Sequence, residues 1–177
     1  MHLEIRNLGA VLTAALLATS IGCATNERGA GLPPALETQM NEAVTRVKHT
    51  RGVDKLGNLR MLSAFGSHAT EKVEVELLAS DDPLLRSNAV FVLGEIYRLE
   101  GDPNALEAIR RVRSDENRAV RLEAARALLD GGDTSGLSEL FDGLEANDRP
   151  TRIHSFLALR RASGGRNFGY DPDADPA

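Results

Sequence analysis

Hydrophobic residues recur with the period of an α-helix from residue 33 to about residue 162. The first such stretch begins at Pro33 and Pro34, and proline suits the first turn of a helix because it lacks the N–H that would be unpaired there. Its apolar positions form one stripe along a helix: Leu36, Met40, Ala43, Val44 and Val47. No segment alternates apolar and polar residues for long enough to indicate a sheet. The chain is therefore predicted to be all-α.

The helical pattern also repeats along the chain. Arg86, Arg121 and Arg152 are spaced 35 and 31 residues apart, and each follows an acidic or polar opening that can cap a helix. A small residue lies three positions after each arginine, and an apolar residue pair lies six and seven positions after it: Ala89, Ala124 and Ser155, then Val92-Leu93, Ala127-Leu128 and Ala158-Leu159. Such self-similarity is typical of repeat architectures.

A break and a second, shorter helix follow the first two of these units, at residues 105–112 and 137–144. An earlier and more degenerate unit has its two helices at residues 53–65 and 69–79. Neither helix of a unit can bury its apolar stripe alone, so the core is expected to form by stacking of neighbouring units. Thr151 and Ser155 make the last unit more polar, as terminal repeats often are; alternatively, this unit docks on something outside the chain.

The string Asp-Pro-x-x-Arg-x-x-Ala-x-x-x-Leu-Gly at residues 82–94, with a weaker echo at 116–129, resembles the HEAT-like repeats of α-solenoid proteins. The resemblance covers roughly residues 50–162 and implies a solenoid of stacked antiparallel helix pairs. It also implies that the second helices line a concave side where a partner protein binds. The outward residues expected there have mixed charges: Lys72, Glu76, Glu107, Arg110, Arg111, Glu139 and Asp142.

The repeated arginines Arg86, Arg121 and Arg152 have two interpretations. They can bind helix ends or acidic residues of the preceding unit and so form a structural ladder along the stack. They can also form a basic stripe for an anionic partner. We favour the ladder, because each arginine lies just inside its own helix start and near carboxylates.

The N-terminal residues form a separate segment. Residues 8–21 are mostly Ala, Leu and Val, a run that has the length of a signal-peptide core and is short for a membrane span. It leads into Gly22-Cys23, which resembles a bacterial lipobox, although Ser20 stands where Leu is usual. The resemblance implies a signal peptide at 1–22, lipidation of Cys23 and a flexible tether at 23–32. Ordinary signal cleavage with secretion, or an uncleaved anchor, are the alternatives.

Composition narrows the function classes. The chain has 177 residues, 21 basic against 26 acidic, and a net charge of −5, which argues against a nucleic-acid binder. The single cysteine excludes an intramolecular disulfide and any multi-cysteine zinc site. Aromatic residues make up only 4%, so the core is expected to consist of Leu, Val, Ile and Ala.

The sequence contains no recognisable catalytic or metal-binding pattern. His49, His68 and His154 have no partner at ligand spacing, and the acidic stretch from Asp171 to Asp175 lacks the Gly and Glu that a calcium loop needs. We expect no enzyme activity, no cofactor, no metal and no small-molecule substrate. Residues 33–163 are predicted to be the repeat domain, and residues 164–177 a disordered, extended acidic tail.

These patterns lead to one functional hypothesis with two alternatives. The chain is predicted to be a non-catalytic protein–protein interaction scaffold, exported and lipid-anchored to the cell envelope on a periplasm-facing membrane surface. The alternatives are an accessory subunit with a structural role in an envelope complex, and a HEAT-like lyase of the kind that attaches bilin chromophores. No candidate acid, base or thiol supports the lyase.

Overall fold

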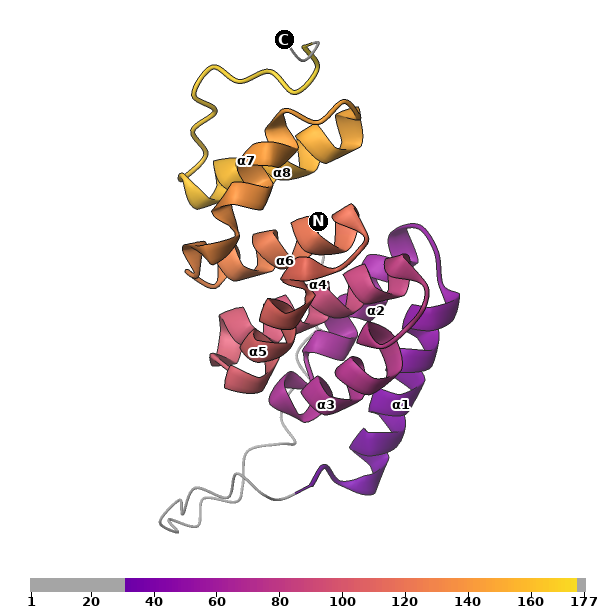
Figure 1. Cartoon of the computed structure of the whole chain (residues 1–177). Coiled ribbons are helices and arrows are strands. Elements are labelled where there is room, and N and C mark those ends of the chain that lie inside the picture. The colour runs from indigo at the N-terminus through magenta and orange to yellow at the C-terminus, as the bar shows by residue number, and fades with distance from the viewer. Residues whose placement is uncertain (1–30, 175–177) are drawn as a thin grey trace, which may run out of the picture. The chain divides into compact units, whose positions relative to one another are not determined.

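The computed structural model describes residues 31–174, and within them it contains helices and no strands (Figure 1). The α-helices are α1 (Pro34–His49), α2 (Val53–Ser63), α3 (Thr70–Val73), α4 (Pro83–Glu100), α5 (Pro103–Arg111), α6 (Arg118–Asp130), α7 (Leu137–Leu144) and α8 (Arg149–Ala162). A 3₁₀ turn at Gly66–Ala69 precedes α3, and a π-helical turn at Glu74–Leu78 continues it. The predicted all-α fold is confirmed.

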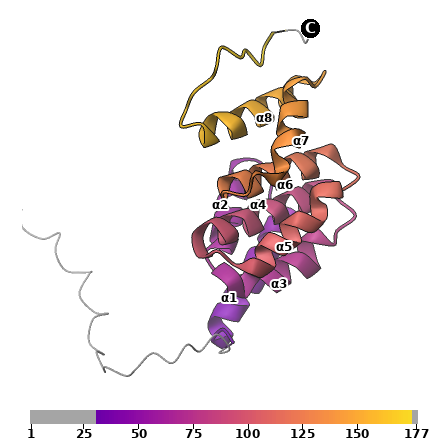
Figure 2. The ribbon, with the colours of Figure 1, turned by 60° about the vertical axis from the view of Figure 1, so that its left-hand side comes forward.

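The helices form antiparallel pairs that stack on one another (Figures 1 and 2). The first helices of successive pairs, α2, α4, α6 and α8, pack against each other in chain order. The second helices are α3 with its π turn, α5 and α7. Both α5 and α7 contact their own first helix and the next one, and α3 with its π turn contacts the next first helix, α4. This is the connectivity of an α-solenoid, in which each repeat contacts only its neighbours.

Polar caps set the start of four of the helices in residues 31–174, as the sequence pattern indicates. Asp82, Asp102 and Asn117 each accept a hydrogen bond from the backbone N–H two residues later, at 2.9, 3.1 and 3.0 Å. Asp148 accepts one from the N–H of Thr151 at 2.9 Å. An N-cap oxygen satisfies one of the donors that a helix leaves unpaired at its start. These four caps therefore begin α4, α5, α6 and α8.

The core consists of small and aliphatic side chains. Ala89, Val92 and Leu93 on α4 are fully buried, as are Ala124 and Leu128 on α6. Gly94 lets these two helices approach closely, because a Cβ placed on it would lie 2.7 Å from the Cβ of Ala127. The scarcity of aromatic residues thus accompanies helices that pack almost backbone to backbone.

The C-terminal tail, predicted to be a disordered acidic extension, makes specific contacts in its described part, residues 164–174. Gly164 and Gly165 have positive φ angles and turn the chain back, with the N–H of Gly165 bonded to the carbonyl of Arg160 at 2.8 Å. Tyr170 then donates its hydroxyl to the carbonyl oxygen of Leu144 at 2.5 Å, and its ring lies 5.5 Å from that of Phe156. These contacts hold the tail against α7 and α8, where the sequence showed only its acidity.

The predicted signal peptide (1–22), Cys23 and most of the tether (23–32) lie outside the described residues. Among the helices of residues 31–174, none combines the length and the apolar character needed to cross a bilayer.

Candidate interaction surface

Arg86, Arg121 and Arg152 make the same pair of hydrogen bonds in three successive repeats. In each case Nη1 donates to the carbonyl oxygens six and five residues earlier, in the loop that follows the preceding second helix. The acceptors are Ser80 and Asp81 at 3.0 and 3.1 Å, Asp115 and Glu116 at 2.8 and 3.2 Å, and Ala146 and Asn147 at 2.8 and 2.9 Å. Each guanidinium thus satisfies two backbone carbonyls of the loop that leads into its own helix. We call this series the arginine ladder.

The other edge of each guanidinium points forward along the chain. Arg86 binds both carboxylate oxygens of Asp115, Arg121 binds Glu139 at 3.1 Å, and Arg152 binds the carbonyl of Pro172 at 3.0 Å. The sequence left two kinds of partner open for these arginines, helix ends or acidic residues of the preceding unit. The preceding unit supplies carbonyls, while carboxylates come from residues that follow in the chain.

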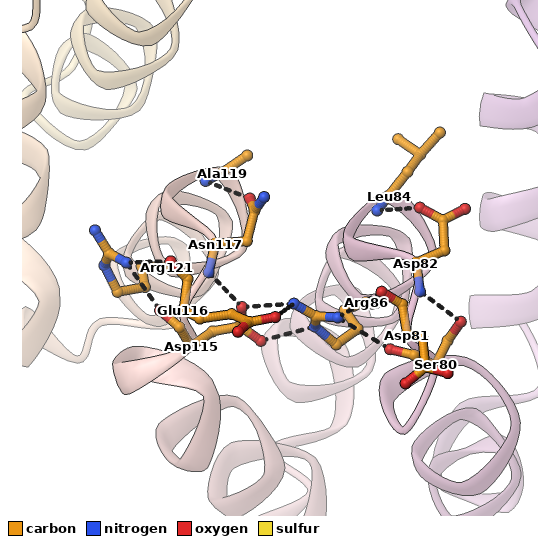
Figure 3. Close-up of polar contacts among 10 residues, drawn as sticks. All are labelled: Ser80, Asp81, Asp82, Leu84, Arg86, Asp115, Glu116, Asn117, Ala119 and Arg121. Atoms are coloured by element: carbon orange, nitrogen blue, oxygen red, sulfur yellow. Dashed lines mark hydrogen bonds and ion pairs between the residues drawn. The ribbon is translucent and has the colours of Figure 1, made fainter.

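Asp115 connects two rungs of the ladder (Figure 3). Its carboxylate accepts two bonds from Arg86, at 2.8 and 2.9 Å, and a third from the N–H of Asn117, at 2.8 Å. Its backbone carbonyl accepts from Arg121. The bond to Arg86, helped by that of Asn117, lowers the pKa of Asp115 and keeps it ionised. With Arg86 only 12% exposed, little of this guanidinium is left for an external anion.

The seven residues predicted to bind a partner lie on the second helices, and we call them the second-helix surface: Lys72, Glu76, Glu107, Arg110, Arg111, Glu139 and Asp142. At its N-terminal end, Glu76 accepts from Lys72 at 2.5 Å and from Lys48 of α1 at 2.7 Å. The bonds from Lys48 and Lys72 lower the pKa of Glu76. This carboxylate therefore stays charged and joins α1 to the turn after α3.

The central part of the second-helix surface consists of bonds between repeats. Arg111 on α5 pairs with Glu74 of the preceding repeat, and Arg110 binds Asp133 of the following repeat at 2.6 Å. The hydroxyl and the N–H of Ser135 together with Arg110 lower the pKa of Asp133 to about 2. These pairs hold α5 to both of its neighbours.

Glu139 belongs to the arginine ladder through Arg121, whereas two of the four acidic residues of the second-helix surface point outward. Glu107 and Asp142 are exposed, and neither side chain forms an ion pair with another residue of 31–174. The seven predicted residues therefore form a row of pairs along the stack, with two unpaired carboxylates, and not a single cluster.

Sequence reasoning missed a buried charge cluster on the first helices. Arg126 of α6 binds Glu123 at 2.5 Å and also pairs with Asp130, and all three side chains are at most 11% exposed. Its guanidinium lies 5.5 Å from the centre of the Phe91 ring on α4. Arg161 of α8 reaches Asp130 at 2.9 Å. The i, i+3 and i, i+4 spacing of Glu123, Arg126 and Asp130 was visible, but such pairs usually lie in solvent.

No group of three or more His, Cys, Asp or Glu side chains within residues 31–174 is arranged to hold a metal ion. Comparison with protein families matches residues 60–160, more than half of the chain, to the family profile described as HEAT repeats. Comparison with curated proteins gives no match.

Proposed function

The chain belongs to the HEAT-repeat family, and from this premise we propose that it is a non-catalytic scaffold that holds a partner protein at the bacterial cell envelope. Proteins built from HEAT repeats commonly serve as scaffolds for protein interaction. The proposed contact is the second-helix surface, and the proposed anchor is a lipid on Cys23.

One observation carries the proposal for the surface: its charges are fixed by bonds between repeats. Arg110 and Arg111 are each held at one side by a carboxylate of a neighbouring repeat, yet they remain 48% and 54% exposed. A partner would therefore meet charges that are already ordered, and binding would lose little conformational entropy. Alternating acidic and basic groups suit a specific polar contact with a protein better than a uniform polyanion.

The proposal for the anchor is supported by the sequence alone. An apolar run ending in Gly22-Cys23 fits a lipoprotein signal, and the acyl chains of a lipidated cysteine would give stable attachment. The short tether would then keep the repeats close to the membrane surface.

The surface is tested by recovery of partners from envelope extracts after crosslinking. Arg110→Glu with Arg111→Glu is expected to abolish recovery of the proteins that crosslink to the wild-type chain. Arg60→Glu, an exposed arginine on α2, is the control and retains them.

A charge swap separates binding from folding. Arg111→Glu alone loses the bond to Glu74, while Arg111→Glu with Glu74→Arg restores an internal pair of reversed sign. We expect partner loss in both variants and a wild-type melting temperature in the swap. Full recovery of the partners by the double reversal at 110 and 111 would overturn the proposed site.

The anchor is tested by mass spectrometry of the mature N-terminus. The expected result is a chain that begins at Cys23 with a diacylglyceryl mass. An unmodified Cys23, or a different first residue, contradicts the lipid anchor and leaves the surface proposal intact.

A further inference from the structure

An apolar groove lies at the C-terminal end of the stack, between α7, α8 and the tail. Its cavity measures about 440 Å³, and apolar side chains form most of its wall: Leu137, Phe141, Leu144, Phe156, Leu159 and Phe168. Phe141 and Phe168 are 55% and 78% exposed, which is unusual for large apolar side chains grouped around one cavity. We call this cavity and its rim the end groove.

The end groove lies where a further second helix would pack. α8 corresponds to α6 in the repeat, so Phe156 and Leu159 take the places of Ala125 and Leu128. On α6, the segment leading into α7 packs here: a Cβ on Gly136 would lie 2.7 Å from the Cα of Ala125. On α8, the described residues include no such helix, and the same face opens into the end groove.

The last rung of the arginine ladder, Arg152, also lacks a partner from a second helix within residues 31–174. Arg121 donates a hydrogen bond to the carboxylate of Glu139, which lies on the second helix of the same pair. Arg152 instead donates to the backbone carbonyl of Pro172 in the tail. The tail thus supplies single contacts in place of a helix.

The groove rim is basic. α8 contains four arginines and no acidic residue. Arg160 and Arg166 both line the cavity, and neither forms an ion pair within residues 31–174. Arg160 lies over the Phe156 ring at 6.0 Å, at the border between the apolar floor and the rim. An occupant with an apolar stripe and carboxylates beside it would match both features.

The chain itself contains a helix of this chemistry. α7 fills the corresponding position on α6, and its apolar residues Leu137, Leu140 and Leu144 alternate with Glu139 and Asp142. The structure therefore indicates both where an occupant would lie and which pattern it would carry.

A strained turn presents an aromatic side chain at the edge of the end groove. Phe168 and Gly169 have φ angles of 50° and 77°, and the N–H of Tyr170 bonds to the carbonyl of Asn167 at 2.9 Å. A positive φ is costly for a residue with a side chain as large as phenylalanine. The turn keeps Phe168 at the solvent edge, where a bound helix would cover it.

We propose that the end groove binds an acidic amphipathic helix of a partner protein, which completes the last helix pair of the stack. This goes beyond the scaffold role of the second-helix surface, because it assigns a separate site and a partner of defined chemistry. The occupant would place its apolar stripe over Phe141, Phe156 and Phe168 and its carboxylates near Arg160 and Arg166.

The probe is a fluorescein-labelled synthetic peptide with the sequence of residues 133–146, titrated with the full mature chain and followed by anisotropy. We expect saturable 1:1 binding in the micromolar range. A peptide with Glu139, Asp142 and Glu145 replaced by glutamine should bind about tenfold more weakly, because carboxylates facing arginines contribute to affinity.

Variants of the chain test the site. Arg160→Glu with Arg166→Glu, and separately Phe168→Ser, should each weaken binding about tenfold or more, since few central residues carry most of the affinity. Leu99→Ser is the matched control: Leu99 is 63% exposed on α4, outside the cavity lining, and the substitution should leave affinity unchanged. All four substituted positions are exposed, and circular dichroism checks that each variant folds.

Several outcomes would overturn the proposal. They are the absence of saturable binding, equal affinity for the acidic and the glutamine peptides, and unchanged binding by the groove variants. If dodecanoate displaces the peptide, the groove is assigned to a small anionic amphiphile. If the chain forms a dimer that excludes the peptide, the groove is assigned to a second copy of the chain. Arg110→Glu with Arg111→Glu must leave peptide binding unchanged, so failure here is distinguishable from failure of the scaffold proposal.

Discussion

Arg86 and Asp115, 29 residues apart, meet side by side: Nε and Nη2 of the arginine donate to Oδ2 and Oδ1 of the aspartate at 2.8 and 2.9 Å. The same aspartate accepts the N–H of Asn117 near the start of α6 and presents its carbonyl to Arg121. One acidic residue therefore fixes α4, the start of α6 and the next arginine relative to one another.

Removal of that carboxylate should destabilise the stack. We expect Asp115→Ala to lower the free energy of unfolding by about 2 kcal/mol, because several charge-assisted bonds are lost and Arg86 keeps only its carbonyl partners. Urea unfolding followed by circular dichroism measures the change. Glu116→Ala is the control, since the Glu116 side chain is 90% exposed and comes no closer to Arg86 than 3.6 Å. Equal losses in the two variants would show that the bidentate geometry has no special weight.

Close packing of α4 on α6 leads to a prediction about glycine. Gly94→Ala should lower the free energy of unfolding by about 1–3 kcal/mol, because the new Cβ would lie 2.7 Å from that of Ala127 in a filled core. Gly57→Ala, in the helix α2 with no atom within 4 Å of the new Cβ, should raise it by up to about 1 kcal/mol through helix propensity. Thermal unfolding of both variants shows whether the free energy of unfolding falls for Gly94→Ala and rises for Gly57→Ala. A stabilising Gly94→Ala would contradict the close approach.

The repeat architecture could be predicted because its determinants are local and periodic. The capping residues Asp82, Asn117 and Asp148 and the apolar stripes recur at fixed offsets, and those offsets alone define helices and their pairing. The arginine ladder follows from the same periodicity: each arginine lies six residues after the carbonyl it binds, so one geometry is repeated three times.

Other features depend on contacts between segments that no local pattern relates. The carboxylate that Arg86 binds, that of Asp115, lies 29 residues later in the chain, and the two residues meet only because the repeats stack. Arg126 looks like a solvent-exposed residue in the sequence, yet Phe91 of α4 covers it. The tail is ordered by single bonds from Tyr170 and Arg152, which composition cannot indicate.

Because Arg126 lies in the buried charge cluster, its substitution should strongly destabilise the fold. Arg126→Ala should lower the free energy of unfolding by about 3 kcal/mol or more, because Glu123 and Asp130 would remain buried with one cation fewer. Arg161→Ala, which removes a 65% exposed arginine from the same Asp130, should have a much smaller effect.

A triple variant tests the cause of that cost. Arg126→Met with Glu123→Gln and Asp130→Asn removes the uncompensated charges and should recover much of the lost stability, as measured by urea unfolding. If the triple variant is no more stable than Arg126→Ala, the unpaired buried charges are not the cause of the loss.

Acid pH should weaken the contact between α5 and the loop before α7. The hydroxyl and N–H of Ser135, with Arg110, lower the pKa of Asp133 from 3.8 to about 2. Between those values the unfolded chain binds more protons at this residue than the folded chain does. The stabilisation from Asp133 is therefore complete above about pH 4 and is lost as the pH falls through about 2.

Urea unfolding of the wild-type chain and of Asp133→Asn at several pH values between 2 and 6 measures this contribution. We expect the variant to be less stable at pH 6 and to lose less of its stability on acidification, because its amide does not titrate. Arg110→Gln should show an intermediate slope, since the bonds from Ser135 remain. A slope for Asp133→Asn as steep as that of the wild type would assign the acid sensitivity to other carboxylates, of which Asp115 and Glu76, whose pKa values are also lowered, would be tested next.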